Sequence, residues 1–300
     1  MPNIENKPTV IYIIADRRSG STLLENMLSK SEEIISVGEL AMLKGHILKE
    51  GPGEMWAWHC SCGKPVLQCD FWSRVLRGAV DSHFETKISW PYKFLTTPLA
   101  SLSPRTSCRS LTSYVHTPEN AQTTGFLKNI YETISRTYDK KFIVDSSKDA
   151  MQALAVYECK EIDAKFIWLI RDLRAVTFSK LKRWQVNKRS DKGAYETMLD
   201  SYAYKKLCKA VLSCMDKEDT LKLHYEAVAD EPQKALDKIC SSFGLKKFAA
   251  PEVMELTNDH TIAGTPGRFE SKPITADNSW RSFYEDKKLL STLGKMFNAL

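Results

Sequence analysis

Apolar and polar residues follow one another along the chain in a pattern that repeatedly predicts a β-strand and then a helix. The first unit is the β-branched and aromatic run at 9–14, a short polar loop, and an amphipathic stretch that begins at Leu23. Further units are predicted at 140–160, 164–184 and 220–243. Because strands that alternate with helices build parallel sheets covered on both faces, the pattern predicts an α/β fold with a central parallel sheet.

One stretch breaks this pattern. Residues 50–125 are rich in Trp, Pro, Ser and Cys and show no long hydrophobic period, and a helical pattern returns only at 126–139. We interpret 50–125 as an insertion of short helices and loops that forms a cap on a single domain spanning 1–300.

Composition narrows the class of protein. With 300 residues, 43% hydrophobic and 27% charged, the chain is typical of globular proteins and unlike disordered, collagen-like or coiled-coil chains. The net charge of +6 is too small to indicate nucleic acid as a partner, but it favours an anionic ligand.

Location is predicted from what the sequence lacks. No apolar run reaches the roughly 18 residues of a membrane span, and the apolar run at 10–15 lacks a preceding basic region. We therefore expect a cytoplasmic protein without a membrane span, whose eight cysteines are free thiols or metal ligands rather than a disulfide framework. The oligomeric state stays open.

The loop after the first strand carries the strongest chemical signal. The window 15–22 reads ADRRSGST, against the GxxxxGK[ST] of nucleotide-binding loops. Gly20 and Thr22 fit, but Ser21 stands where the Lys is needed and the cation comes earlier, at Arg18. Backbone N–H groups of such a loop and the following helix N-terminus form an anion site.

This shifted pattern resembles the 5′-phosphosulfate loop of the sulfotransferases that use 3′-phosphoadenosine 5′-phosphosulfate (PAPS), most closely their carbohydrate, tyrosyl-protein and bacterial branches. The resemblance implies a P-loop-like sheet. It also implies that the phosphosulfate is held by one continuous set of residues: Arg17, Arg18, Ser19, Gly20, Ser21 and Thr22.

Three further segments resemble motifs of the same family. Arg171 at a strand end and Ser179 in the next helix match the pair that grips the 3′-phosphate, a task suited to a forked guanidinium donor. Tyr225 matches a tyrosine at the adenine edge, and Arg268 lies in a GTPGRF segment similar to the family's GNPxRF loop. Each could instead be a helix cap, a core tyrosine or a solvated turn.

Catalytic candidates follow from the same resemblance. Glu39, after Gly38, stands where some branches carry a glutamate base, and Lys148 in DSSKD stands where a lysine assists transfer. A histidine base from His46, His59, His83 or His116 is the less favoured alternative. Lys182 and Arg183, in the helix after the 3′-phosphate motif, are expected on a solvated face.

A cysteine patch lies in the predicted cap. Cys60, Cys62 and Cys69 offer three soft metal ligands, with His59 as a possible fourth. The CxC spacing is tighter than in common zinc sites and no second CxxC pair follows. A reduced cluster or a local disulfide is therefore favoured over zinc, and we predict no metal requirement for catalysis.

Taken together, these motifs predict an enzyme that moves a sulfuryl group from PAPS to an acceptor hydroxyl on a carbohydrate, lipid or small metabolite, leaving 3′-phosphoadenosine 5′-phosphate (PAP). Two alternatives stay open: a small-molecule kinase on the same strand–loop–helix, and a non-catalytic zinc- or nucleotide-binding module.

Overall fold

The computed structural model describes residues 9–43, 59–79, 107–187, 192–254, 260–264 and 271–300. Five parallel strands form the central sheet in the order β2-β3-β1-β4-β5. Their bounds are Thr9–Ala15 (β1), Ile34–Gly38 (β2), Phe142–Lys148 (β3), Asp163–Ile170 (β4) and Thr220–His224 (β5). The strands β6 (Val253–Met254) and β7 (Lys272–Pro273) form a separate antiparallel pair. The predicted α/β fold with a parallel sheet is confirmed.

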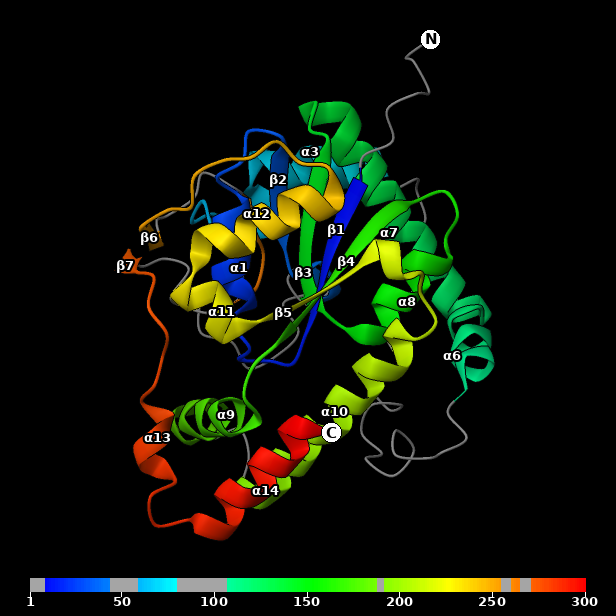
Figure 1. Ribbon diagram of the computed structural model, residues 1–300. Helices are drawn as coiled ribbons and strands as arrows, with labels where there is room; N and C mark the ends of the chain where they lie inside the picture. The colour runs from blue at the N-terminus through cyan, green and yellow to red at the C-terminus, as the bar shows by residue number, and fades with distance from the viewer. Residues whose placement is uncertain (1–8, 44–58, 80–106, 188–191, 255–259, 265–270) are drawn as a thin grey trace.

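Helices cover both faces of the sheet (Figure 1). Those of the first half are α1 (Ser21–Leu28), α3 (Asp70–Ala79), α6 (Cys108–Val115), α7 (Pro118–Tyr138) and α8 (Ala150–Glu158). Those of the second half are α9 (Leu173–Asn187), α10 (Ala194–Leu212), α11 (Tyr225–Asp230), α12 (Pro232–Phe243), α13 (Trp280–Phe283) and α14 (Lys288–Ala299). No described helix is both long enough and apolar enough to cross a membrane.

The central strand β1 explains why two cores form. Val10, Tyr12 and Ile14 point into the core shared with α3, α7, α8 and α10. Ile11, Ile13 and Ala15 point to the opposite face, into the core shared with α1 and α12. All of these side chains are buried, as expected for a strand whose two faces are both covered.

The connections of β1 and β3 locate the ligand-binding end. The chain leaves β1 through α1 on one face and leaves β3 through α8 on the other. In open α/β sheets, ligands bind at the carboxyl ends of strands where the connections diverge in this way. The ends of β1 and β3 carry the predicted phosphate loop and the DSSKD segment.

The pattern was wrong at two places. It did not predict β2, which is short and carries Ser36 and Gly38 between apolar residues, although all its residues are buried. It placed the start of α7 at 126, whereas the helix begins at Pro118. The first turns of α7 are polar (PENAQTT), which hides them from a hydrophobic period.

The stretch predicted as a cap is described only in part. Its described portion contains α3 and α6, whose apolar residues belong to the core on one sheet face. Trp72 is fully buried there. Cys108 and Cys214 form a disulfide across Cα atoms 5.4 Å apart, so not every cysteine is a free thiol as expected.

Candidate active site

The loop between β1 and α1 has the backbone shape of an anion site. Arg18 and Gly20 both adopt left-handed conformations, with φ of 73° and 89°. Gly20 caps α1 without a side-chain hydrogen bond, so the first N–H groups of the helix stay available to a ligand. An αL residue other than glycine costs energy, and such strain clusters at functional sites.

Gly20 is required for a second reason, which is close contact with a neighbour. A Cβ at this position would lie 2.2 Å from Cδ2 of Tyr225, the first residue of α11. Tyr225, predicted from sequence as an adenine contact, thus packs directly on the phosphate loop.

The two halves of the predicted phosphate site meet. Nε of Arg18 donates to Oγ of Ser179 at 3.0 Å, and Nη1 of Arg171 donates to the carbonyl oxygen of Arg18 at 3.0 Å. These residues come from the loop, from α9 and from the end of β4, and their side chains are all at least partly buried. The structure therefore brings together the residues predicted for the 5′-phosphosulfate and for the 3′-phosphate.

Arg171 itself is only partly satisfied. Its side chain is 6% exposed, and its buried Nε finds no hydrogen-bond partner among the described residues. Nη2 pairs with Oδ2 of Asp277 at 3.2 Å, and the guanidinium lies 4.3 Å from the centre of the Tyr225 ring. A buried guanidinium donor without an acceptor is costly unless a ligand supplies one.

Electrostatics around Arg18 point the same way. Burial lowers the pKa of Arg18, and the nearby positive charges of Arg183 and Arg171 lower it further, against the opposing effect of Asp277. Arg183 was expected on a solvated face but acts on the loop. The loop thus holds more positive charge than the protein itself neutralises, which favours an anionic ligand.

Two residues that sequence analysis did not single out hold this site in place. Asp277 pairs with Arg171, and Lys180, 8% exposed, donates to both carboxylate oxygens of Asp16 at 2.7 Å. Lys180 directly follows Ser179, so a lysine next to the phosphate motif was the available signal. Asp277 lies in a segment without a recognisable motif.

Glu39 and Lys148, the predicted catalytic pair, form an ion pair with each other. Their side chains are 18% and 12% exposed. Lys148 adopts a left-handed conformation with φ of 70°, and its carbonyl oxygen accepts a hydrogen bond from the hydroxyl of Tyr204 at 2.6 Å. In the sheet, Lys148 is the register partner of Ile14, which places the pair beside the phosphate loop.

Buried carboxyl groups lie beneath this pair. Glu25 of α1 accepts hydrogen bonds from Ser36 at 2.5 Å and Ser146 at 2.7 Å, and burial raises its pKa. Burial also raises the pKa of Asp145 to about 6, although it accepts hydrogen bonds from Ser147 and Tyr131. By accepting hydrogen bonds from Ser146 and Ser147, these carboxyl groups hold the carboxyl end of β3 in place.

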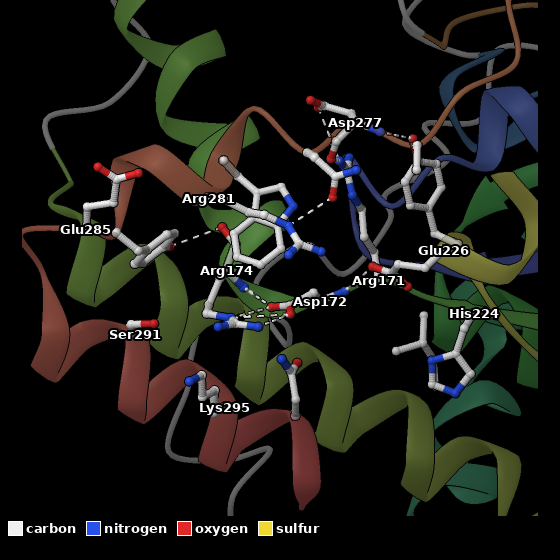
Figure 2. Close-up of a pocket in the computed structure, with 17 residues that line it drawn as sticks. Arg171, Asp172, Arg174, His224, Glu226, Asp277, Arg281, Glu285, Ser291 and Lys295 are labelled. Atoms are coloured by element: carbon white, nitrogen blue, oxygen red, sulfur yellow. Dashed lines mark hydrogen bonds and ion pairs between the residues drawn. The ribbon is translucent and has the colours of Figure 1, made fainter. Parts of the chain in front are cut away.

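A pocket of about 650 Å³ opens next to Arg171 and Tyr225 (Figure 2). It lies between the ends of β4 and β5 and the helices α13 and α14, and its charged lining is mixed in sign. Asp172 and Arg174 pair with each other across 2.6 Å in its wall. Arg171 and Tyr225 therefore face both the phosphate loop and this pocket.

The other predicted residues fall in three groups. Ser19 and Ser21 are buried, Thr22 is half-buried, and Arg17 is exposed. His116 pairs with Glu158 at 3.3 Å, which leaves it away from the loop. Outside the described residues lie Arg268, His46 and His83.

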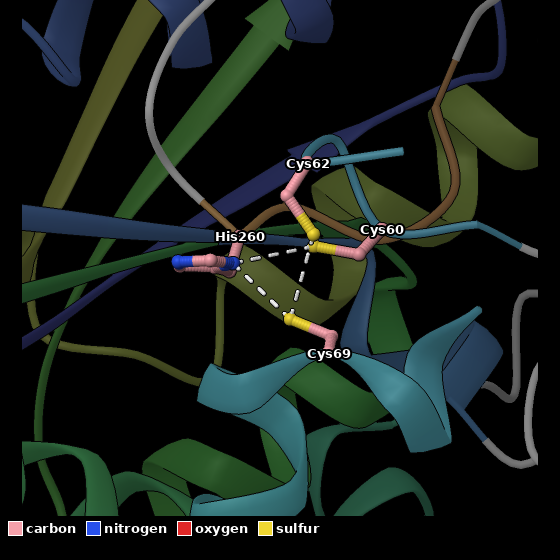
Figure 3. A group of neighbouring side chains, drawn as sticks. All are labelled: Cys60, Cys62, Cys69 and His260. Atoms are coloured by element: carbon pink, nitrogen blue, oxygen red, sulfur yellow. Dashed lines mark hydrogen bonds between the residues drawn. The ribbon is translucent and has the colours of Figure 1, made fainter. Parts of the chain in front are cut away.

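The fourth residue of the cysteine group is His260 rather than His59. Cys60, Cys62, Cys69 and His260 lie together in one group (Figure 3). His59 instead forms a β-bridge with Pro65. Among the described residues, the three sulfurs are free thiols and form no local disulfide.

The chain is similar in sequence to one family of known proteins. The family model described as the sulfotransferase family matches residues 8–249. A search of curated protein sequences finds no significant match.

Solved structures with a similar fold are also found. The sulfotransferase domain from the curacin biosynthetic pathway shares 17% identity at a TM-score of 0.52, over 93% of this chain and 90% of that one. The sulfotransferase domain from the Synechococcus PCC 7002 olefin synthase shares 20% identity at a TM-score of 0.48, over 94% of this chain and 90% of that one. At 17% identity, the likeness to the curacin domain shows the fold alone.

Proposed function

The chain belongs to the sulfotransferase family, and we propose that it transfers a sulfuryl group from PAPS to an acceptor hydroxyl, giving PAP and a sulfate ester. The observation that carries the proposal is the buried Nε of Arg171, which lacks a partner among the described residues and lies in a group that also contacts Arg18. Two phosphate-bearing ends of one ligand would satisfy such a group of cations.

The residues present fit this donor. Arg18 and the N–H groups at the start of α1 would bind the 5′-phosphosulfate, where helix N-termini favour negative charge. Arg171 and Ser179 would bind the 3′-phosphate through a forked, charged donor and a hydroxyl. Tyr225 would keep Arg171 in position through the contact of its ring with the guanidinium.

The transfer step assigns a task to each remaining residue. Glu39 accepts the proton of the acceptor hydroxyl as the acceptor oxygen forms its bond to sulfur. The bond between sulfur and the bridging phosphate oxygen breaks, and its electron pair leaves on that oxygen. Arg18 and Lys148 stabilise the charge that develops there. Lys148 must first turn from Glu39, because the two now neutralise each other.

The acceptor class is the least defined part of the proposal. A carbohydrate, a lipid headgroup and a small metabolite each offer the hydroxyl that the chemistry requires. A metal ion is not needed in any step assigned to these residues.

Two rival functions make different predictions. A kinase on the same loop would need a lysine where Ser21 stands and would transfer phosphate from Mg-ATP. A non-catalytic nucleotide-binding module would bind PAP without turnover of PAPS. A non-catalytic zinc module would bind metal but not PAP, and it leaves the grouping of Arg18, Arg171 and Ser179 without a purpose.

Calorimetric titration of the full chain with PAP, and with ADP for comparison, tests the proposal. We expect PAP to bind at least tenfold more tightly than ADP, because only PAP carries a 3′-phosphate. Arg171→Ala should abolish this preference, whereas the matched control Arg136→Ala, at an exposed position of α7, should retain it. Equal binding of PAP and ADP by the unaltered chain, or a preference that survives in Arg171→Ala, would overturn the proposal.

A further inference from the structure

The group of Cys60, Cys62, Cys69 and His260 lies outside the site described above and has no role in the transfer step. Its three sulfurs and one histidine ring nitrogen all lie within 4.8 Å of one another. Figure 3 shows the four side chains pointing toward a common centre from two separate segments of the chain. Two of the cysteines are fully buried, and Cys62 is exposed.

The distances match those between ligands of a tetrahedral metal ion. Sγ of Cys60 and Sγ of Cys69 lie 3.5 and 3.2 Å from Nδ1 of His260, and the sulfurs of Cys62 and Cys69 are 3.7 Å apart. Zinc bonds of about 2.3 Å to sulfur and about 2.0 Å to nitrogen give tetrahedral edges of roughly 3.8 Å between sulfurs and roughly 3.5 Å between sulfur and nitrogen.

We propose that these four side chains bind one Zn²⁺ ion in a closed, structural site. Three thiolates and one imidazole complete the coordination of zinc and leave no open position for a substrate, which distinguishes structural from catalytic zinc sites. Soft thiolate ligands also exclude Mg²⁺ and Ca²⁺, which bind oxygen.

Neighbouring residues fix the position of His260 and the orientation of its ring. The indole N–H of Trp72 donates to the carbonyl oxygen of His260 at 2.7 Å, and the ring of Phe71 stacks on the imidazole at 4.9 Å and 6°. The next residue, Thr261, exchanges two hydrogen bonds with Ser61, each of 2.9 Å. Contacts of this kind, between a metal ligand and the residues around it, orient the ligand and raise metal affinity.

The proposed ion would fasten the segment of residues 59–72 to the segment of residues 260–262. The latter extends the sheet beside β2, because the N–H of Ile262 donates to Val37 at 3.1 Å and the N–H of Glu39 donates to Ile262 at 2.9 Å. A Cβ on Gly38 would lie 2.2 Å from the oxygen of Ile262, so this approach is close. The zinc proposal can be tested independently of the proposed sulfuryl transfer, because metal content is measured without substrate.

Elemental analysis of the full chain, purified under reducing conditions without chelator, tests the proposal. We expect one zinc per chain. After removal of zinc, added Co²⁺ should give the thiolate charge-transfer and visible bands of a tetrahedral site. A metal-free preparation that gives no cobalt bands, or one in which thiol titration finds a disulfide among the three cysteines, would overturn the proposal.

Variants assign the ligands. Cys62→Ser, at the exposed member of the group, should weaken zinc binding by more than the roughly 10- to 100-fold typical of changes around a ligand. His260→Cys should keep the ion, because four thiolates also form a zinc site. Cys159→Ser, at a free thiol outside the group, is the matched control, and loss of zinc from it to the same extent would contradict the assignment.

Discussion

Two parts of the candidate site differ in charge: the proposed phosphate side, made of Arg18, Arg171 and Ser179, and the proposed acceptor side, made of Glu39 and Lys148. On the phosphate side, Arg18 and Arg171 lie together. Among the described residues, Asp277 is the acidic group whose charge raises the pKa of Arg18, against burial and the charges of Arg183 and Arg171, which lower it. On the acceptor side, Glu39 and Lys148 carry opposite charges and pair directly.

This contrast separates binding from chemistry. The phosphate side has an excess of positive charge, and an anion that enters it relieves repulsion as well as forming hydrogen bonds. The acceptor side is already neutral, so substrates must separate an existing pair before the base can act. We therefore expect changes on the phosphate side to alter affinity, together with rate in the case of Arg18, and changes on the acceptor side to alter rate with little effect on affinity.

The largest effect should follow from removing the base. Glu39→Gln should slow release of PAP from PAPS, with water as the acceptor, by about 10²- to 10⁴-fold, the usual contribution of a general base. PAP affinity measured by calorimetry should stay within about threefold, because the side chain of Glu39 pairs with Lys148 and, among the described residues, forms no ion pair with Arg18 or Arg171. Glu218→Gln, at an exposed position, serves as the control. An equal loss of PAP affinity would remove the distinction between the two sides.

The free energy of unfolding should depend on pH through Asp145, which lies beneath the pair of Glu39 and Lys148. The pKa of Asp145 is raised to about 6 by burial, so its neutral form favours the folded state. That stability is fully present below the ordinary value near 3.8 and is lost as pH rises through about 6. The difference in unfolding free energy between the unaltered chain and Asp145→Asn should therefore fall by about 2 kcal/mol from pH 4 to pH 7.

Urea unfolding of both chains across this range measures that difference. Asp286→Asn, which alters an exposed carboxylate, should show no such dependence. A constant difference between the unaltered chain and Asp145→Asn would refute the assignment to Asp145.

Removing a phosphate-side cation should have a smaller effect, which is measured here as affinity for PAP. Arg18→Ala should weaken PAP binding by roughly 10- to 150-fold, since a hydrogen bond to a charged group is worth about 1.5–3 kcal/mol. The loss should shrink in high salt, where exposed parts of the anion are screened. Calorimetry at two salt concentrations measures both, and a loss no larger than that of Arg136→Ala would count against a role for Arg18.

The smallest effect is expected at Ser179. Ser179→Ala removes a hydroxyl whose oxygen now accepts a hydrogen bond from Nε of Arg18, so PAP affinity should fall by only about 2- to 12-fold, as for a typical net hydrogen bond. Thermal unfolding should change little, because Arg18 keeps its contact with Arg171. A loss as large as that of Arg18→Ala would mean that Ser179 mainly positions Arg18.

The sequence predicted those elements whose characteristic residues lie in one short, uninterrupted stretch. The apolar runs of β1, β3 and β4 and the loop with Arg18 and Gly20 are each contained in fewer than about ten residues, so pattern and chemistry could be interpreted together. The fold is confirmed. The roles of the site residues stay predictions, although the structure groups Arg18, Arg171 and Ser179 and pairs Glu39 with Lys148.

Long-range partners could not be predicted. His260 joins the cysteine group from 191 residues beyond Cys69, and Asp277 reaches Arg171 from 106 residues away. Nothing in the residues around either one indicates its partner, because register and packing of the whole sheet decide which distant segments meet. For the same reason His59, a neighbour in sequence, was the wrong fourth member of the group.

The family match ends at residue 249, but the candidate site does not. The oxygen of Ile262 that binds the N–H of Glu39 and the carboxylate of Asp277 that pairs with Arg171 both come from later residues. A chain cut at the end of the match would keep Arg18, Arg171, Ser179 and Glu39, to which binding and catalysis are proposed, and yet lose the groups that hold Arg171 and Glu39 in place. We therefore expect the smallest active form of this chain to be longer than the part by which its family is recognised.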